Sequence, residues 1–123
     1  MTANEYQQLA LRTEATPPFI TDDLRLSRVM HGAMGMVTES AELMDMLKKH
    51  ILYGKTFDLV NVKEEAADCL WYIALALDAC GFTLEEAMES NIQKLRVRYP
   101  VKFTEEQALV RDLDAERKSL ENI

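Results

Sequence analysis

The sequence predicts an all-α protein, and three observations lead to this expectation. Only four of the 123 residues are glycine and three are proline, so residues that interrupt helices are scarce. Apolar residues recur at three- and four-residue spacing, whereas the alternation typical of strands is hard to find. Capping residues precede most of the apolar stretches. With 48% hydrophobic and 28% charged residues, the chain has the balance of a globular protein, and we expect a single domain over residues 1–123.

The N-terminal half predicts two helices of unequal length. Residues 4–14 form a short amphipathic pattern that the breaker Thr16-Pro17-Pro18 ends. Thr21-Asp22-Asp23 then supplies N-cap chemistry for a long helix that runs to about Lys49. The connection that follows turns at Gly54. Both helices place an apolar stripe toward the rest of the chain.

Two further helices and a polar C-terminal helical region complete the expected four to five helices. They run from a cap at Asn61 to Ala79, from a capping box at Thr83 to just before Tyr99, and from Thr104 to about Leu120. Gly81 is the expected stop of the first of these. Gly32 and Gly35 fall inside the long second helix, where each costs about 1 kcal/mol relative to Ala. We therefore expect another backbone or a ligand to approach the helix closely at these two glycines.

Charge and cysteine content narrow the class of protein. The formal net charge of -7 argues against binding of nucleic acid polymers, which relies on clustered Lys and Arg. It leaves a phosphate ligand open, because a bound Mg²⁺ inverts the local sign of charge. Cys69 and Cys80 stand eleven residues apart in one expected helix, about 16 Å along its axis, too far for a mutual disulfide. A cytoplasmic protein without a membrane partner is expected, since no signal segment or long apolar run is found.

Two acidic pairs, Glu39/Glu42 and Glu65/Asp68, lie on separate expected helices. Residues three apart share a helix face at about 5–6 Å between Cβ atoms. At about 100° per residue, both pairs border the apolar stripe of their helices rather than pointing away from it. If the two helices pack antiparallel, the pairs converge, and four adjacent carboxylates need a hard cation such as Mg²⁺, Mn²⁺ or Ca²⁺.

Two alternatives bear on this acidic site. Acid pairs at this spacing are common, and most are solvated surface charges, so an ordinary helix surface stays open. A di-iron bundle would need Glu-x-x-His motifs. Neither His31 nor His50 has a Glu three residues before it, so the di-iron interpretation fails.

Read together, these segments resemble the MazG-like, all-α nucleoside triphosphate pyrophosphohydrolase family. The matching stretches are HGAMGMVTESAEL, LKKHILYGK, EEAADCLWYIALAL and NIQKLRVRYPVKF, while RDLDAERKSLE is similar to the tail of the short, stand-alone and often phage-encoded branch. The likeness covers about residues 24–120. It implies a MazG-like helical bundle with a core over about 22–99, a C-terminal helical extension over about 104–121, and an active site on two central antiparallel helices.

The resemblance also implies an activity. Family members cleave an NTP or dNTP to the monophosphate and pyrophosphate. Glu39, Glu42, Glu65 and Asp68 would then be metal ligands and catalytic residues for Mg²⁺, with Mn²⁺ as a substitute, and one nonbridging carboxylate would be the general base. Which carboxylate acts as the base is left open. Ala67 stands where the family commonly has Gly, a departure that leaves every ligand intact.

Further residues are candidates for substrate binding. Phosphate contacts are expected from Lys49, Lys55, Lys94 and Arg98, and contacts to sugar or base from Asn91, Tyr72, Trp71 and His31. For each of them an ordinary role competes. The cations can be solvated surface charges, the aromatic side chains can be core residues, and a histidine on a helix can be structural.

Our sequence-based reading is a nucleoside triphosphate pyrophosphohydrolase that forms a homodimer or a dimer of dimers, in which a second chain completes the pocket. Two rivals from other classes stay open. One is a nucleotide- or alarmone-binding regulator that hydrolyses little. The other is a helical interaction module whose acids are surface residues.

Overall fold

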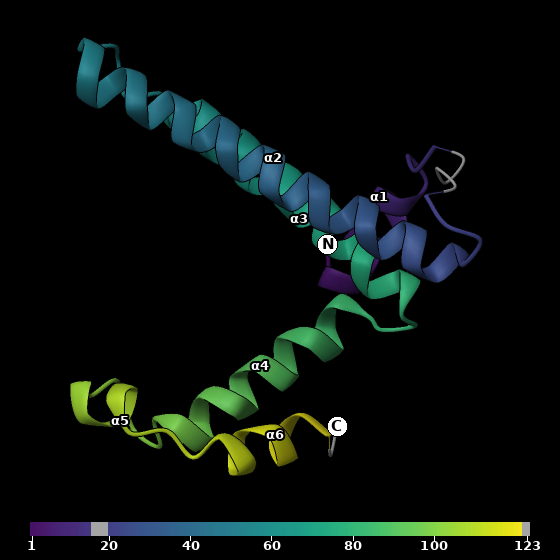
Figure 1. Ribbon diagram of the computed structural model, residues 1–123, viewed down its shortest axis with the longest axis vertical. Helices are drawn as coiled ribbons and strands as arrows, with labels where there is room; N and C mark the ends of the chain where they lie inside the picture. The colour runs from purple at the N-terminus through teal and green to yellow at the C-terminus, as the bar shows by residue number, and fades with distance from the viewer. Residues whose placement is uncertain (16–19, 122–123) are drawn as a thin grey trace. The chain divides into compact units, whose positions relative to one another are not determined.

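The computed structural model describes residues 1–15 and 20–121, and over this range the chain is all-helical (Figure 1). The helices are α1 (Ala3–Leu11), α2 (Leu24–Tyr53), α3 (Leu59–Ala79), α4 (Leu84–Arg98), α5 (Glu105–Leu109) and α6 (Leu113–Glu121). The all-α expectation is thereby confirmed. The Thr16–Pro18 breaker lies outside the described residues.

Two compact units make up the chain, Met1–Thr83 and Leu84–Ile123. The first contains α1, α2 and α3, and the second contains α4, α5 and α6. Within the described part of the chain, no single helix is long and apolar enough to cross a membrane. The helices α3 and α4 pass that test only as a bent pair, by length and composition alone.

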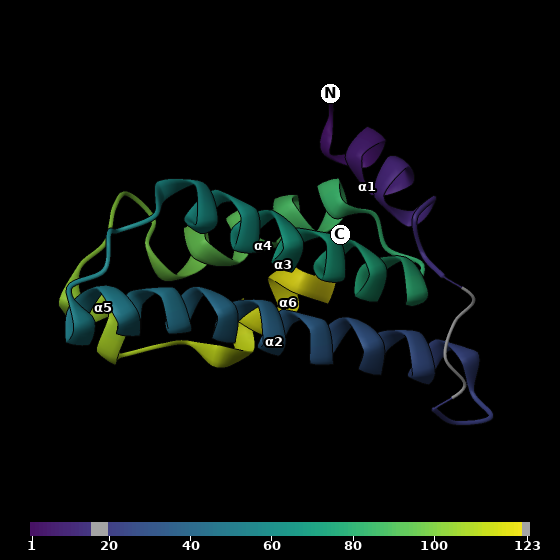
Figure 2. The same ribbon diagram turned by 90° about the horizontal axis from the view of Figure 1, so that it is seen from above.

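An antiparallel pair of long helices, α2 and α3, forms the body of the first unit (Figure 2). Helix α2 begins as expected, because the Asp23 side chain accepts a hydrogen bond from the Leu26 amide at 3.1 Å. It continues past the expected end at Lys49 as far as Tyr53, where Gly54 adopts φ 65° and ends it in a left-handed cap. Gly54 is therefore the turn residue, as predicted.

The start of α3 differs from the sequence-based expectation. Asp58, not Asn61, is the N-cap, and its carboxylate accepts hydrogen bonds from the amides of Val60 at 3.0 Å and Asn61 at 3.1 Å. The helix consequently begins at Leu59. The Asn61 side chain is instead drawn to Glu65, one turn further on, by a hydrogen bond of 2.7 Å. The expected end at Ala79 is confirmed, with Gly81 at φ 79° just beyond it.

Gly32 and Gly35 allow α2 and α3 to approach closely, as the sequence predicted. A Cβ atom on Gly32 would lie 2.9 Å from the Tyr72 carbonyl oxygen and 3.0 Å from the Ala76 Cβ. On Gly35 it would collide with the Tyr72 ring. The two helices can adopt this spacing only because both positions lack a side chain.

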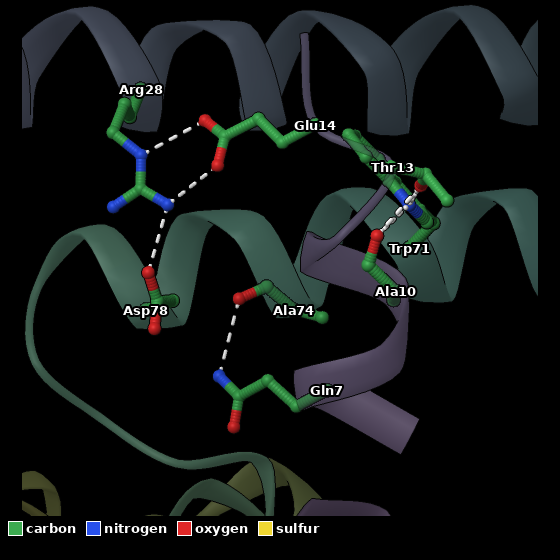
Figure 3. Close-up of polar contacts among 8 residues, drawn as sticks. All are labelled: Gln7, Ala10, Thr13, Glu14, Arg28, Trp71, Ala74 and Asp78. Carbon is green, nitrogen blue, oxygen red and sulfur yellow. Dashed lines mark hydrogen bonds and ion pairs between the residues drawn. The ribbon is translucent and has the colours of Figure 1, made fainter. Parts of the chain in front are cut away.

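Helix α1 is fixed to α3 by polar contacts that run in both directions (Figure 3). The buried Gln7 donates from Nε2 to the carbonyl oxygens of Ala74 at 3.2 Å and Phe82 at 3.1 Å. In the opposite direction, the Trp71 indole donates from Nε1 to the carbonyl of Ala10 at 3.0 Å and to Thr13 Oγ1 at 2.8 Å. Because these contacts satisfy groups that are costly to leave unpaired, they specify how α1 sits on α3.

An ion-pair cluster around Arg28 ties the segment after α1 to both long helices. Its guanidinium binds Glu14 through two hydrogen bonds, 3.0 and 2.9 Å, and also Asp78 at 2.8 Å (Figure 3). The hydrogen bonds that Arg28 donates to Glu14, the largest cause, and to Asp78 hold the pKa of Arg28 above its ordinary value. Bidentate pairing of this kind is stronger than a single contact between point charges.

In the second unit, the expected last helix is broken into α5 and α6, which corrects the prediction of one helical region from Thr104 to Leu120. Thr104 caps α5 as predicted, since its hydroxyl accepts from the Gln107 amide at 3.2 Å. Val110 is extended, with φ −110° and ψ 97°. Asp112 then starts a new helix by accepting from the Ala115 amide at 2.9 Å. The Asp112 side chain stabilises a new helix start by accepting a backbone amide, and this interrupts the helix that the polar pattern predicted.

Glu116 is the buried polar centre of the second unit. It is 4% exposed, and both of its carboxylate oxygens accept hydrogen bonds from Arg98, at 2.8 and 2.7 Å, and from Arg111, at 3.2 and 2.6 Å. The hydrogen bonds from Arg98, which are the largest cause, and those from Arg111 hold the pKa of Glu116 far below its ordinary value. A carboxylate in this state links α6 to α4 as long as it stays ionised.

A pH dependence follows from this pairing. Because the pKa of Glu116 is lower in the folded state, its stabilising effect is complete above the unfolded value of about 4.3 and declines as the pH falls below it. We expect Glu116→Gln to destabilise the chain at pH 7, with a smaller difference from the wild type at pH 3. Thermal melts of both proteins across this range measure the difference. A gap that stays constant with pH would contradict the assignment.

Candidate functional site

Three of the four predicted acidic residues converge between α2 and α3. Glu39, Glu42 and Glu65 each offer one carboxylate oxygen, and these oxygens lie within 4.8 Å of one another. Glu65 is buried, at 5% exposure, Glu39 is half-buried and Glu42 is exposed. The antiparallel packing of α2 and α3 thus brings both acid-bearing helix faces together within one chain. We call these three residues the acidic cluster.

Asp68, the fourth predicted residue, lies outside this group. It is exposed and sits one turn after Glu65 on α3. Its charge nevertheless reaches Glu39, because it contributes to the raised pKa of that carboxyl. Asp68 is therefore an electrostatic neighbour of the acidic cluster in this conformation.

The acidic cluster is electrostatically unfavourable without a counterion. Burial, the largest cause, raises the pKa of Glu39 above its ordinary value, and the charges of Glu42 and Asp68 raise it further. A hydrogen bond with Glu65 acts in the same direction. Each of these causes disfavours the ionised form, and a cation among the carboxylates would offset them.

The residues fit a hard divalent cation. The acidic cluster offers carboxylate oxygens only, the ligand type that Mg²⁺, Mn²⁺ and Ca²⁺ prefer. The exposed Glu42 leaves one side open, as Mg²⁺ requires when it keeps waters or binds substrate phosphates. A buried carbonyl oxygen on Asn61, next to Glu65, has no hydrogen-bond partner. Carboxylate ligands together with an unpaired acceptor are the surroundings that a hydrated cation satisfies.

A cavity of about 620 Å³ opens beside the acidic cluster, a size suited to a small-molecule ligand. Its walls come from the C-terminal part of α2, the α2–α3 loop and the start of α3. The lining residues are Ala41, Glu42, Asp45, Met46, Lys49, Lys55, Thr56, Asp58, Asn61 and Glu65. Lysine and carboxylate side chains therefore line the same cavity.

Both lysines expected there line this cavity. Lys49 already pairs through Nζ with Asp45 at 2.6 Å, one turn earlier on the same helix. Lys55 lies in the loop, where its carbonyl oxygen is 2.6 Å from His50 Nδ1. This contact between the end of α2 and the Lys55 backbone holds the loop in place and leaves the Lys55 side chain for other partners. An incoming phosphate would compete with Asp45 for Lys49.

Sequence reasoning missed several cavity residues, namely Asp45, Thr56, Asp58 and Asn61. Asp45 continues the acidic face of α2, three residues after Glu42. Asn61 was interpreted only as a cap. The signal that could have found it is the spacing of four residues to Glu65, which places the two side chains on one helix face.

The three aromatic residues predicted for the base lie together elsewhere. The ring of His31 is 6.4 Å from that of Trp71 and 5.7 Å from that of Tyr72, both edge-on. The Trp71 indole donates a hydrogen bond to α1, and the Tyr72 ring packs on Gly35. Among the residues that line the described cavity, none of these three occurs. Their packing gives these three residues an ordinary structural role, and their contact with a base stays a prediction.

The remaining predicted residues belong to the second unit. Asn91 is exposed and Lys94 is half-buried on α4. Arg98, further along the same helix, donates two hydrogen bonds to Glu116. Its guanidinium is therefore engaged within its own unit.

The fold and the acidic cluster define an all-α domain in which two antiparallel helices bring three carboxylates together. Comparison with family models agrees. The model of the MazG nucleotide pyrophosphohydrolase domain matches residues 32–103, more than half of the chain. The chain belongs to this family. No curated protein and no solved structure gives a match. The matched range contains all three members of the acidic cluster and Asp68, whereas α1, α5 and α6 lie outside it.

Proposed function

We propose that this protein is a Mg²⁺-dependent pyrophosphohydrolase that cleaves a nucleoside or deoxynucleoside triphosphate to the monophosphate and pyrophosphate. The observation that carries the proposal is the acidic cluster, set beside a cavity with two lysines in a chain of the MazG family. Hydrolysis of a phosphoanhydride needs charge neutralisation on the phosphates and an activated water, and this site has residues suited to both tasks.

Each group has a role in this proposal. Glu39, Glu42 and Glu65 would hold the metal, and Asp68, one turn after Glu65, would be the fourth carboxylate ligand. The metal, when bound, neutralises phosphate oxygens and lowers the pKa of a water molecule. Lys49 and Lys55, which line the same cavity as Glu42 and Glu65, bind the phosphates. A carboxylate of the set that does not bridge the metal accepts the proton of the attacking water.

The remaining predicted contacts keep their place in the proposal. Asn91, Lys94 and Arg98, all on α4, keep their predicted assignment to the sugar and phosphates. The base is assigned to Tyr72, Trp71 and His31. Because these residues do not line the described cavity, the base would have to extend beyond it. The free thiols of Cys69 and Cys80 fit a cytoplasmic setting.

A pyrophosphate-release assay tests the activity. The purified chain is incubated with each of the common NTPs and dNTPs and with guanosine tetraphosphate, with and without Mg²⁺. Release of pyrophosphate from at least one triphosphate, dependent on metal, is the expected result. Binding without release would favour the regulator. A melting temperature unchanged by millimolar Mg²⁺ and nucleotide would favour the interaction module.

An exposed apolar stripe on α2 supports a homo-oligomer, and we assign it to a second copy of this chain. The stripe follows the alternating four- and three-residue spacing of a coiled-coil seam: Met30, Met34, Val37, Ala41, Met44, Lys48 and Ile51. Its five large apolar members are between 36% and 74% exposed. Val37 lies about 160° around the helix from Gly35, which faces α3.

Charge favours an antiparallel pairing of two α2 stripes. In a parallel pair in register, two Lys48 side chains would face each other inside an apolar seam, which is unfavourable. In an antiparallel pair in which Ala41 faces the partner's Met44, Lys48 lies opposite the apolar Val37 instead. The dipoles of the two helices also oppose each other in that arrangement.

We expect Met34→Glu with Val37→Glu to convert the assembly to single chains, because both acids would enter the seam. Light scattering coupled to size-exclusion chromatography measures the mass. Val60→Glu, an equally exposed apolar position on α3, is the matched control and should keep the wild-type mass. An unchanged mass in the double variant would exclude the α2 stripe as the interface.

A further inference from the structure

Asn61 connects the first turns of α3 to the acidic cluster. Its side-chain amide donates from Nδ2 to Glu65 Oε1 at 2.7 Å. Glu65 is 5% exposed and offers an oxygen to the cluster with Glu39 and Glu42. Asn61 lies four residues before Glu65, so the two side chains share one face of α3. The amide therefore fixes the orientation of the most buried carboxylate of the three.

The carbonyl end of the same side chain is unpaired. Asn61 Oδ1 is buried and has no hydrogen-bond partner. The amide cannot be turned around to remove this defect, because Oδ1 would then face the carboxylate oxygen of Glu65. A buried acceptor without a partner is uncommon in folded proteins and calls for an explanation, often a water or ion at that place.

The surroundings of Asn61 indicate what the partner is. Asn61 and Glu65 both line the cavity beside the acidic cluster, with Glu42. A divalent cation held by these carboxylates carries water molecules, which are hydrogen-bond donors. An acceptor that contacts the waters and ligands of a metal, but not the metal itself, orients them.

Resting on the proposed function, we propose that Asn61 is a positioning residue of the metal site. Its amide holds Glu65 in the orientation that faces Glu39 and Glu42, and its carbonyl oxygen accepts a hydrogen bond from a water bound to the metal. Asn61 itself touches neither the metal nor the substrate. It is the one polar side chain in the described part of the chain that combines a hydrogen bond to the acidic cluster with a buried, unpaired acceptor.

A competing interpretation is that the hydrogen bond between Asn61 and Glu65 only stabilises the start of α3. The two roles differ in what they do to metal binding. A structural pair would change the melting temperature of the metal-free chain and leave its affinity for metal unchanged. A positioning residue would change the affinity for metal, while the metal-free chain would melt close to the wild type, since the Asp58 cap is retained.

The experiment measures Mn²⁺ binding by electron paramagnetic resonance for the wild type, Asn61→Leu and Asn61→Ala. Leu has a similar size and excludes a replacement water, whereas Ala keeps the helix if Leu disturbs folding. We expect Mn²⁺ affinity to fall about 10- to 100-fold in Asn61→Leu, as when other side chains that orient metal ligands are removed. Val60→Ala, at the neighbouring exposed position, is the control and should bind like the wild type.

A kinetic readout separates positioning from chemistry. In Asn61→Ala, the Mg²⁺ concentration needed for half-maximal pyrophosphate release should rise, while kcat at saturating Mg²⁺ should recover most of the wild-type value. Unchanged Mn²⁺ affinity in both Asn61 variants would overturn the inference, whatever their rates. Failure of the wild type itself to bind Mn²⁺ or release pyrophosphate would instead overturn the proposed function, so the two failures are distinguishable.

Discussion

Glu39→Gln is expected to lower pyrophosphate release by about 1000-fold or more, since loss of several kcal/mol of metal-derived stabilisation corresponds to this factor. Glu39 is the member of the acidic cluster on which the other charges converge. Its pKa is raised by burial and by Glu42, Asp68 and Glu65. Glutamine keeps the size of the side chain but offers a weaker, neutral ligand.

The fold should survive this change, which makes the result interpretable. Removing one charge from three adjacent carboxylates relieves repulsion, so metal-free Glu39→Gln should melt at or above the wild-type temperature. Its melting temperature should no longer rise with Mg²⁺, because stabilisation by a ligand requires binding to the folded chain. Full activity in this variant would remove the metal-cage mechanism.

Two further acids calibrate the effect. Glu64→Gln changes an exposed neighbour of Glu65 that lies outside the acidic cluster, and it should retain wild-type activity and a wild-type response to Mg²⁺. Asp68→Asn should also abolish pyrophosphate release if the ion draws Asp68 into the site. Activity that withstands Asp68→Asn but not Glu39→Gln would restrict the ligand set to the three residues that already converge.

Gly35→Ala is the second large expected effect, and it acts on stability. The new methyl group would overlap the Tyr72 ring, and that ring is held between His31 and Trp71. Overpacking of this kind costs about 3 kcal/mol or more here, at the upper end of the usual range, against a gain of about 1 kcal/mol in helix propensity. We expect a net loss of about 2 kcal/mol in the free energy of unfolding, measured by urea denaturation.

A second substitution tests the cause. Tyr72→Ala removes the ring and leaves room for the methyl group, so adding Gly35→Ala to Tyr72→Ala should cost far less than adding it to the wild type. The difference between the two costs is the coupling energy of the pair. Equal costs in both backgrounds would mean that the glycine is needed for some reason other than contact with Tyr72.

The sequence anticipated the two-helix site because its signals were local and repeated. Three-residue spacing fixed which face each acid pair occupies, and the position beside the apolar stripe indicated that both faces would meet. Gly32 and Gly35 marked the close approach of α3. These inferences needed only helix geometry, which a sequence specifies well.

The errors in helix boundaries arose where more than one side chain can cap a helix. Asp58 and Asn61 can both cap a helix, and the upstream Asp prevailed because its carboxylate accepts from two amides. Asp112 similarly divided the C-terminal region into α5 and α6. The packing partners of Trp71 on α1 and of Tyr72 at Gly35 could not be read from the sequence, because an aromatic side chain suits a base as well as a core; their contact with a base stays a prediction.

The docking of α1 gives this protein a built-in optical probe. Trp71 is the sole tryptophan of the chain, and its indole nitrogen is bonded to Ala10 and Thr13. Intrinsic fluorescence excited at the tryptophan band therefore reports on the environment that α1 creates. Since Tyr72 follows Trp71 directly and packs against α2, separation of the long helices would perturb the same emission. A stopped-flow trace of one unlabelled protein thus tests whether the contact between α1 and α3 changes during nucleotide turnover.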